Sequence, residues 1–388
     1  MHSMEYGKIS LPEGVTLRFS AFKRKGTDEY HLVVTPAKGV PAGVQYDQIE
    51  SAVGAFMRQR ELQHPQVVFR RFLVSDVSNQ AALIRQAAHP GTASSLSVIQ
   101  QPPAAGNKML AWVYLIENHV ENFDNQTFNG SFAFGHNGYT HLYTSGMTSS
   151  TEPGAYPQSL AIFNSYTEFL RENGMSLVNN CMRTWLFVRD IDNHYAGMVK
   201  ARNEIFEAEG LRRNTHYIAS TGIEGQSEKT HALVAMDAYA IHGIAAEQVR
   251  HLKALTHLSP THDYGVAFER GTAVDYGDRR QIFISGTASI DHRGHVLHQG
   301  DIALQTARTF ENIRTLLVEA EAGFDDISSM MVYLRDLADT PYITAYLQEH
   351  FPGVPALVAI APVCRHGWLI EVECTATIAN SHPAFRDF

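Results

Sequence analysis

Two glutamates separated by a single residue, Glu371 and Glu373, lie in the otherwise apolar run 368–376 near the end of the chain. Side chains alternate between the two faces of a β-strand, so both carboxylates point to the same face. Carboxylates on a buried sheet face are costly unless they are paired or functional. A desolvated glutamic acid with a raised pKa would suit proton donation, whereas an ion pair with an arginine such as Arg335 would make the same residue structural.

The loop before this strand, residues 362–367, offers a cation and a thiol. The planar guanidinium of Arg365 suits bidentate binding of a carboxylate, and a solvated loop arginine is the alternative. Cys364 lies next to it, and a neighbouring cation lowers the pKa of a thiol. Because His366 is the only base nearby in the sequence, we interpret Cys364 as a small buried side chain that shapes a pocket.

Signals for metal and nucleotide sites are missing from the sequence. His292, His295 and His298 are spaced by three in a predicted hairpin, which does not place them on one strand face, and the chain has no HExxH. It also has no G-x-G-x-x-G, P-loop or G-x-S-x-G motif. We therefore expect no metal and no organic cofactor.

The elements that must position these residues recur three times along the chain. Hydrophobic periodicity and helix-capping signals in the last third predict strands at 281–286, 330–336, 356–360 and 368–375, a hairpin at 291–296, and helices at 302–320 and from 340 onward. The middle third repeats this order with strands at 142–146, 185–190, 217–219 and 231–240 and helices at 156–171 and 193–207. The first third has helices at 46–62 and 79–88 and strands at 67–76, 96–99 and 109–116.

This repetition predicts an α+β fold of three tandem units, each with two helices on one face of a mixed sheet. The expected units are residues 1–122, 123–250 and 251–388, with a helix and a loop over 245–261 as the last connection. Three such sheets can bury their free faces against each other around one axis, so that a single chain forms a pseudo-trimer. We expect a monomer or a loose dimer in solution.

The candidate chemistry belongs to the third unit alone. The corresponding loops, residues 101–106 in the first unit and 220–225 in the second, contain no arginine, and the strands after them have no Glu-x-Glu pair. The sequence therefore predicts that the third unit carries the active site.

Composition limits the classes of function. Of 388 residues, 44% are hydrophobic and 18% are charged, which excludes a disordered or fibrous chain. The net charge of −9 gives no broad electrostatic footprint for nucleic acid, so an anionic ligand would need a local cationic pocket. Three cysteines favour a reducing compartment, and no apolar run is long enough to span a membrane. We expect a cytoplasmic protein with neither nucleic-acid nor membrane partners.

The third unit, residues 265–378, resembles the Rid/YjgF family. The matching pieces are Ile284-Ser285-Gly286, Gln305 and Asn312 on one helix, the strand 332–336, Cys364-Arg365, and the strand 370–373. The resemblance implies a trimer fold like that of chorismate mutase. It also implies that carboxylated ligands bind in clefts between neighbouring units, held by Arg365.

The whole chain resembles the chorismatases. The pieces that suggest this are the motifs 270–272, 285–290, 298–301 and 333–335, together with Cys364 placed seven residues before Glu371. The resemblance implies cleavage of chorismate to pyruvate plus a dihydroxylated diene acid or a hydroxybenzoate, with Glu371 as the catalytic acid. Two rival interpretations are an imine or enamine deaminase and a non-catalytic protein that binds small carboxylates.

A chorismatase site also implies roles for other residues. Arg365 and Arg335 would hold the two carboxylates of chorismate, and Tyr217 and Thr221 would join the cleft from the second unit. Arg202, on a predicted helix of that unit, is assigned to a surface ion pair. Gly271 and Cys364 resemble the small residues of the subtype that makes 3-hydroxybenzoate, which is therefore the expected aromatic product.

Overall fold

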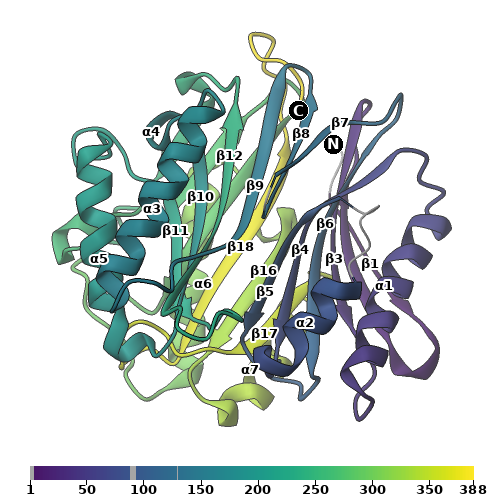
Figure 1. Ribbon diagram of the computed structural model, residues 1–388, viewed down its shortest axis with the longest axis horizontal. Helices are drawn as coiled ribbons and strands as arrows, with labels where there is room; N and C mark the ends of the chain where they lie inside the picture. Colours follow the sequence, from purple (N-terminus) through teal and green to yellow (C-terminus); the bar gives the residue numbers. More distant parts are fainter. Residues whose placement is uncertain (1–3, 88–92, 129) are drawn as a thin grey trace.

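The computed structural model describes residues 4–87, 93–128 and 130–388, and it contains three six-stranded mixed sheets (Figure 1). Each sheet has the same strand order, in which the sixth strand of the unit lies between the third and the fourth. The predicted α+β fold of three tandem units is confirmed by this repeated topology.

The first sheet has the order β1-β2-β3-β6-β4-β5, and only β4 and β5 are parallel. Its strands are β1 (Glu5–Ser10), β2 (Thr16–Phe22), β3 (Thr27–Thr35), β4 (Pro65–Val74), β5 (Ser95–Gln100) and β6 (Met109–Asn118). Its helices are α1 (Ala42–Gln59) and α2 (Val77–Ala87). Residue 88, the predicted end of the second helix, lies outside the described residues.

The second sheet repeats this arrangement in the order β11-β10-β12-β9-β8-β7. Its strands are β7 (Asp124–Phe128), β8 (Ser131–His136), β9 (Tyr139–Thr148), β10 (Cys181–Val188), β11 (Ala219–Glu224) and β12 (Val234–His242). Its helices are α3 (Ala155–Glu172), the short α4 (Leu177–Asn180) and α5 (Ile191–Ala208).

The third sheet has the order β13-β14-β15-β18-β16-β17. Its strands are β13 (Val249–Leu252), β14 (Gly271–Asp275), β15 (Arg279–Ala288), β16 (Ile327–Leu334), β17 (Ala356–Ile360) and β18 (Ile370–Ala379). Its helices are α6 (Ile302–Glu319) and α7 (Thr340–His350). We propose that the units are divided at the connections near residues 122 and 250, the second of which falls within β13.

Helices cover the outer faces of the sheets, and the inner faces meet in a shared core (Figure 1). This core combines buried side chains of all three units, such as Trp112, Trp185 and Phe283. Separate apolar clusters lie between the helices and the sheets of the first and second units. The inner core accounts for the pseudo-trimer, because each sheet has a second apolar face that only the other two units can cover.

Three buried ion pairs join the units in a ring. Arg71 of the first sheet binds Asp237 of the second at 2.8 Å, and Arg183 of the second binds Glu373 of the third at 2.5 Å. Arg279 of the third sheet closes the ring by binding Glu29 of the first at 2.7 Å. Arg71 and Arg183 would each be a buried charge without an ion-pair partner if the neighbouring unit were absent, whereas Arg279 also binds Asp278 of its own unit at 2.7 Å. The ring therefore favours one mutual placement of the three sheets.

The connection between the last two units was predicted wrongly. Residues 245–261 contain the strand β13 with a short 3-10 helix before it, and a second 3-10 helix starts at Thr261. β13 pairs with β14 along all four of its residues. Periodicity within so short a segment does not distinguish a strand from a helical turn, and the pairing partner lies about twenty residues further on.

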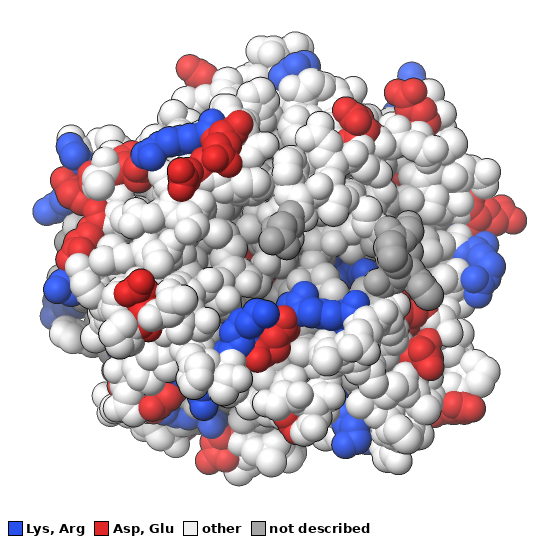
Figure 2. All heavy atoms as spheres, in the orientation of Figure 1, with Lys and Arg blue, Asp and Glu red and all other residues white. Residues whose placement is uncertain are grey.

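Positively and negatively charged side chains are mixed over the face of the molecule shown in Figure 2.

Candidate active site

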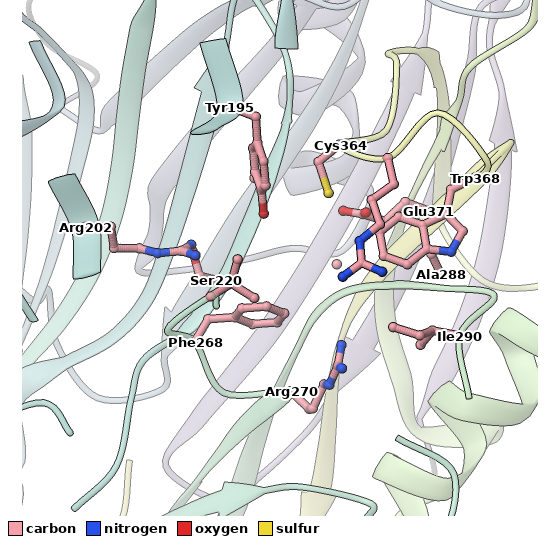
Figure 3. Close-up of a pocket in the computed structure, with 14 residues that line it drawn as sticks. Tyr195, Arg202, Ser220, Phe268, Arg270, Ala288, Ile290, Cys364, Trp368 and Glu371 are labelled. Atoms are coloured by element: carbon pink, nitrogen blue, oxygen red, sulfur yellow. The ribbon is translucent and has the colours of Figure 1, made fainter. Parts of the chain in front are cut away.

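A cavity of about 220 Å³, hereafter the main cavity, lies between the second and third units. The second unit contributes residues of α5 and β11, and the third unit contributes β15, the loop before β18, and β18 itself. The lining residues labelled in Figure 3 are Tyr195, Arg202, Ser220, Phe268, Arg270, Ala288, Ile290, Cys364, Trp368 and Glu371, and Arg365 also lines the cavity. The cavity is of a size for one small molecule rather than a polymer.

Glu371 is the acid of the main cavity. It is the second residue of β18, lies opposite Ala288 and Tyr333 in the sheet, and is only 4% exposed. Burial, with a further contribution from the nearby Glu373, raises the pKa of Glu371 to about 8, although Arg183 and Arg270 oppose the shift. At neutral pH this residue is therefore a carboxylic acid with a proton to donate.

A β-bulge makes room for that carboxyl group. The pairing of β15 with β18 shifts register between Ile284 and Thr287, so the segment with Gly286 bulges out of the ladder. A side chain at Gly286 would overlap the carboxyl oxygen of Glu371. The backbone N–H of Gly286 donates to Oγ1 of Thr221 in the second unit at 2.9 Å. The bulge thus brings backbone, rather than a side chain, against the acid.

Glu373 is the structural partner in the Glu-x-Glu pair. Its carboxylate accepts hydrogen bonds from Arg183 at 2.5 Å, Trp185 at 2.9 Å, Tyr333 at 3.1 Å and the hydroxyl of Thr221. The expectation that Arg335 supplies the ion pair is wrong, because Arg335 binds Asp192 at 2.9 Å. The actual partner lies on β10 of the neighbouring unit, 190 residues away in the sequence.

Three arginines line the main cavity with Glu371. Arg365 is held by a hydrogen bond to the carbonyl of Gly294 at 3.0 Å and lies over Trp368 at 4.8 Å. Arg270 donates to the carbonyl of Ser259 at 3.0 Å. Arg202 is 1% exposed and lies on the cavity side of α5, which corrects its assignment to a surface ion pair. Three guanidinium groups around one neutral acid suit a ligand with more than one negative charge.

A thiol and a phenol complete one end of the cavity. The Tyr195 hydroxyl, the Cys364 sulfur and the Glu371 carboxyl point toward one another in Figure 3. Burial, with Glu371 adding to it, raises the pKa of Cys364 to about 12. Burial also holds the pKa of Tyr195 well above its usual range. Both groups are neutral at physiological pH, so Cys364 contributes a small, weakly polar thiol to the cavity wall and is not a thiolate nucleophile.

Comparisons with known proteins match the last third of the chain. The family model described as Endoribonuclease L-PSP matches residues 270–378. A RutC family protein of Pyrococcus abyssi is 39% identical over 98 residues, which are 24% of this chain and 76% of that protein. The chain belongs to the RutC family. The 3-aminoacrylate deaminase RutC of Acinetobacter baylyi is 35% identical over 71 residues, or 18% of this chain and 56% of that protein.

Structural similarity to a known protein covers more of this RutC-family chain than the family model does. A crystal structure of a chorismatase aligns with a TM-score of 0.63 and covers 91% of this chain and 100% of its own, at 16% identity. The predicted relationship to Rid-like proteins and the predicted chorismatase-like fold are therefore confirmed. No helix in the described part of the chain is long and apolar enough to cross a membrane.

Several residues selected from the sequence lie outside the lining of the main cavity. Arg335 is engaged by Asp192 and by the carbonyl of Val363. Gly271 begins β14 and packs against Leu252 and Ile284, so its small size serves the sheet. Thr221 is buried behind the cavity, where it binds Gly286 and Glu373.

Tyr217 also lies elsewhere, in a smaller neighbouring cavity. Residues 364, 365 and 371 are the predicted site residues that the structure brings together in one cavity.

Sequence reasoning missed Tyr195, Arg202 and Arg270 as cavity residues. Arg270 stands in the motif Arg270-Gly271-Thr272, but the motif drew attention to its glycine. The buried positions on α5 carried a signal, because Arg202 follows Met198 and Val199 on the face of the helix that is buried. A charged residue on such a face is a candidate for function.

The other two junctions between units lack the acid. Glu371 is the second residue of β18, and the second residues of β12 and β6 are Ala235 and Leu110. The pairing partners are also equivalent, since Tyr333, Phe187 and Leu73 are each the penultimate residue of the adjacent strand. The acid of the main cavity therefore occurs at one of three related positions in this chain.

Among the described residues, one group of side chains lies close enough together to hold a metal ion. It consists of Asp28, Glu117 and His119. These residues lie on or next to β3 and β6 of the first unit, away from the main cavity. His292, His295 and His298 do not form such a group.

Proposed function

We propose that this RutC-family protein cleaves the enol ether of chorismate, releasing pyruvate. The observation that carries the proposal is a buried, protonated glutamic acid, Glu371, at the wall of a cavity that also holds three arginines. The chorismatase-like fold of the whole chain supports the same reaction class. The reaction needs a proton donor and anion binding and no metal or organic cofactor.

Anion binding falls to Arg202, Arg270 and Arg365. Chorismate carries two carboxylates, one on the ring and one on the enolpyruvyl side chain, and guanidinium groups bind carboxylates in a bidentate manner. The arginines come from α5, from the segment before β14 and from the loop before β18. Because they approach from both units, they suit two carboxylates at separate ends of one ligand.

Proton transfer starts the reaction. The Glu371 carboxyl donates its proton to the methylene carbon of the enol ether, which creates a cation at the adjacent side-chain carbon and a Glu371 carboxylate. Burial of Glu371 keeps the acid protonated at neutral pH and removes competing water from the donor. Arg183 and Arg270, whose charges favour the ionised form of Glu371, stabilise the new carboxylate as it forms.

Two fates of this cation give two product sets. Attack by water on the side-chain carbon gives a hemiketal, which breaks its C–O bond to release pyruvate and the dihydroxylated diene acid. Attack by the neighbouring ring hydroxyl on the ring carbon instead breaks the ring C–O bond and releases pyruvate without consuming water, and the resulting epoxide rearranges to 3-hydroxybenzoate. A proton lost in either path returns to Glu371.

We propose 3-hydroxybenzoate as the main aromatic product. Cys364 is the small residue that supports this choice, because it lines the cavity next to Glu371. Gly271 lends no support, since it lies within the sheet packing. Ala288, Ile290 and Trp368 add apolar surface to the same cavity, which disfavours an attacking water.

Deamination of an imine or enamine is the second candidate, favoured by the 35% identity to the 3-aminoacrylate deaminase RutC. It would use Arg365 to hold the substrate carboxylate while Glu371 and a water handle protons. The third arginine and the size of the main cavity exceed what such a small substrate requires, so we place it second.

Incubating the protein with chorismate while following pyruvate release tests the proposal. Glu371→Gln should retain the fold and chorismate binding but lose turnover by roughly a hundredfold or more, because the amide has no acidic proton. The matched control is Glu349→Gln, the same change at an exposed position on α7.

Ammonia release from 2-aminoacrylate or 3-aminoacrylate, with no pyruvate from chorismate, would instead establish the deaminase. Chorismate binding without any turnover would make the protein a non-catalytic carboxylate binder.

A further inference from the structure

A second cavity of about 130 Å³ lies beside the main cavity and has no part in the chemistry above. Phe268 and Arg270 line both cavities, so their side chains form the wall between them. The guanidinium of Arg270 lies over the Phe268 ring at 5.4 Å, and that of Arg202 lies over the same ring at 5.8 Å. A cationic wall thus separates the two spaces.

Cations dominate the lining of the second cavity. Arg212, Arg213, Lys253 and Arg270 line it together with one acid, Glu269. Arg212 is ion-paired with Glu207 at 2.8 Å, so Arg213, Lys253 and Arg270 carry the argument. Burial raises the pKa of Glu269, although a hydrogen bond from the backbone of Tyr217 and the charge of Lys253 oppose the shift. The net charge of the protein is −9, so the second cavity is a locally positive site in a negatively charged protein.

The cavity also offers apolar and aromatic surface. Tyr217, Leu255, Pro260 and Phe268 line it between the cations. Arg213 and Lys253 are exposed and come from different units, Arg213 after α5 in the second unit and Lys253 after β13 in the third. This combination suits a ring that carries a carboxylate, with the ring against Tyr217 or Phe268 and the carboxylate among the cations.

We propose that the second cavity is a docking site for small cyclic carboxylates, which concentrates an anionic substrate beside the main cavity before it enters. Its role as an entry site rests on the proposed function; the binding site itself does not. Arg213 and Lys253 attract the anion from solution, and Arg270, which faces both cavities, carries the cationic surface inward. A cleft lined by one sign of charge accelerates association with an oppositely charged ligand and loses this advantage in salt.

The kinetic test compares two double variants with equal loss of charge. Arg213→Gln with Lys253→Gln removes the exposed cations of the second cavity, and Lys8→Gln with Lys38→Gln removes two exposed cations of the first unit. At low salt the first variant should lose about tenfold in kcat/KM for chorismate with kcat unchanged, and its salt dependence should flatten. The control should keep the wild-type value and slope. Equal salt slopes in wild type and the first variant would overturn the entry role.

A second test needs no turnover. Crystals soaked with 4-bromobenzoate should show anomalous bromine scattering in the second cavity of the wild-type protein and none there in the Arg213→Gln, Lys253→Gln variant. Bromine in the main cavity alone, or in neither cavity, would refute the docking site. If chorismate yields no pyruvate at all, the proposed function fails, while the bromine position still decides whether the carboxylate site exists.

Discussion

Replacing Glu373 by Gln should move the pH dependence of the reaction without removing the catalytic acid. Glu373 points to the same side of β18 as Glu371 and accepts hydrogen bonds from Arg183, Trp185 and Tyr333. Its charge is one of the causes that raise the pKa of Glu371. Glutamine keeps the shape of the side chain and removes the charge, so the proton on Glu371 becomes easier to lose.

The expected size of the shift follows from strand geometry. Residues two apart along a strand are separated by about 6.7 Å, and two unit charges at that distance interact by about 2.5 kcal/mol at an effective dielectric constant of about 20. One pKa unit corresponds to about 1.4 kcal/mol. The pKa of Glu371 should therefore fall by between one and two units, from about 8.

The direction in which kcat/KM changes with pH follows from the protonation state of Glu371 that reacts. Glu371 must be protonated to react, so kcat/KM of the wild type should fall as the pH rises through about 8. In Glu373→Gln the fall should begin between one and two pH units lower. The variant should approach wild-type kcat/KM near pH 5.5 and be about five- to fiftyfold below it at pH 8.

The assay is pyruvate release from chorismate between pH 5 and 9, with circular dichroism to verify folding. Asp237→Asn is the matched control, because Asp237 forms the equivalent buried ion pair with Arg71 and the main cavity lies elsewhere. Both variants leave a buried arginine unpaired and should lose similar stability, on the order of 3–5 kcal/mol. An unchanged pH profile in a folded Glu373→Gln protein, or the same shift in Asp237→Asn, would refute the reasoning.

Three further outcomes follow from the geometry. Gly286→Ala should fold yet lose roughly a hundredfold in kcat, since a methyl group there displaces the Glu371 carboxyl; normal turnover in that variant would contradict the placement of the acid. Arg202→Gln should raise KM for chorismate by about tenfold or more, whereas Arg335→Gln should change it little, and steady-state kinetics of the pair tests which arginine binds substrate. Light scattering should give the mass of one chain, or of a loose dimer, because the three units already close around one core; an obligate trimer of chains would contradict this.

The sequence by itself determined the features that depend on local order. The repeated succession of strands and helices predicts three α+β units, because periodicity of two or of about 3.6 residues is a property of short segments. The same parity argument places Glu371 and Glu373 on one face of β18, as the structure has them. The contrast between the third unit and the other two was also readable, since Ala235 and Leu110 stand where Glu371 stands.

Tertiary structure alone decided which of these residues meet. Arg183 rather than Arg335 neutralises Glu373, and Arg202 and Arg270 rather than Arg335 face the main cavity. These contacts join segments far apart in the chain, and their geometry depends on how three sheets close on a shared core. The edge strand β13 could not be predicted from the sequence for the same reason, because its four residues form a strand only by pairing with β14. Local sequence sets what each element is, and the closure of the three units sets which charges they bring together.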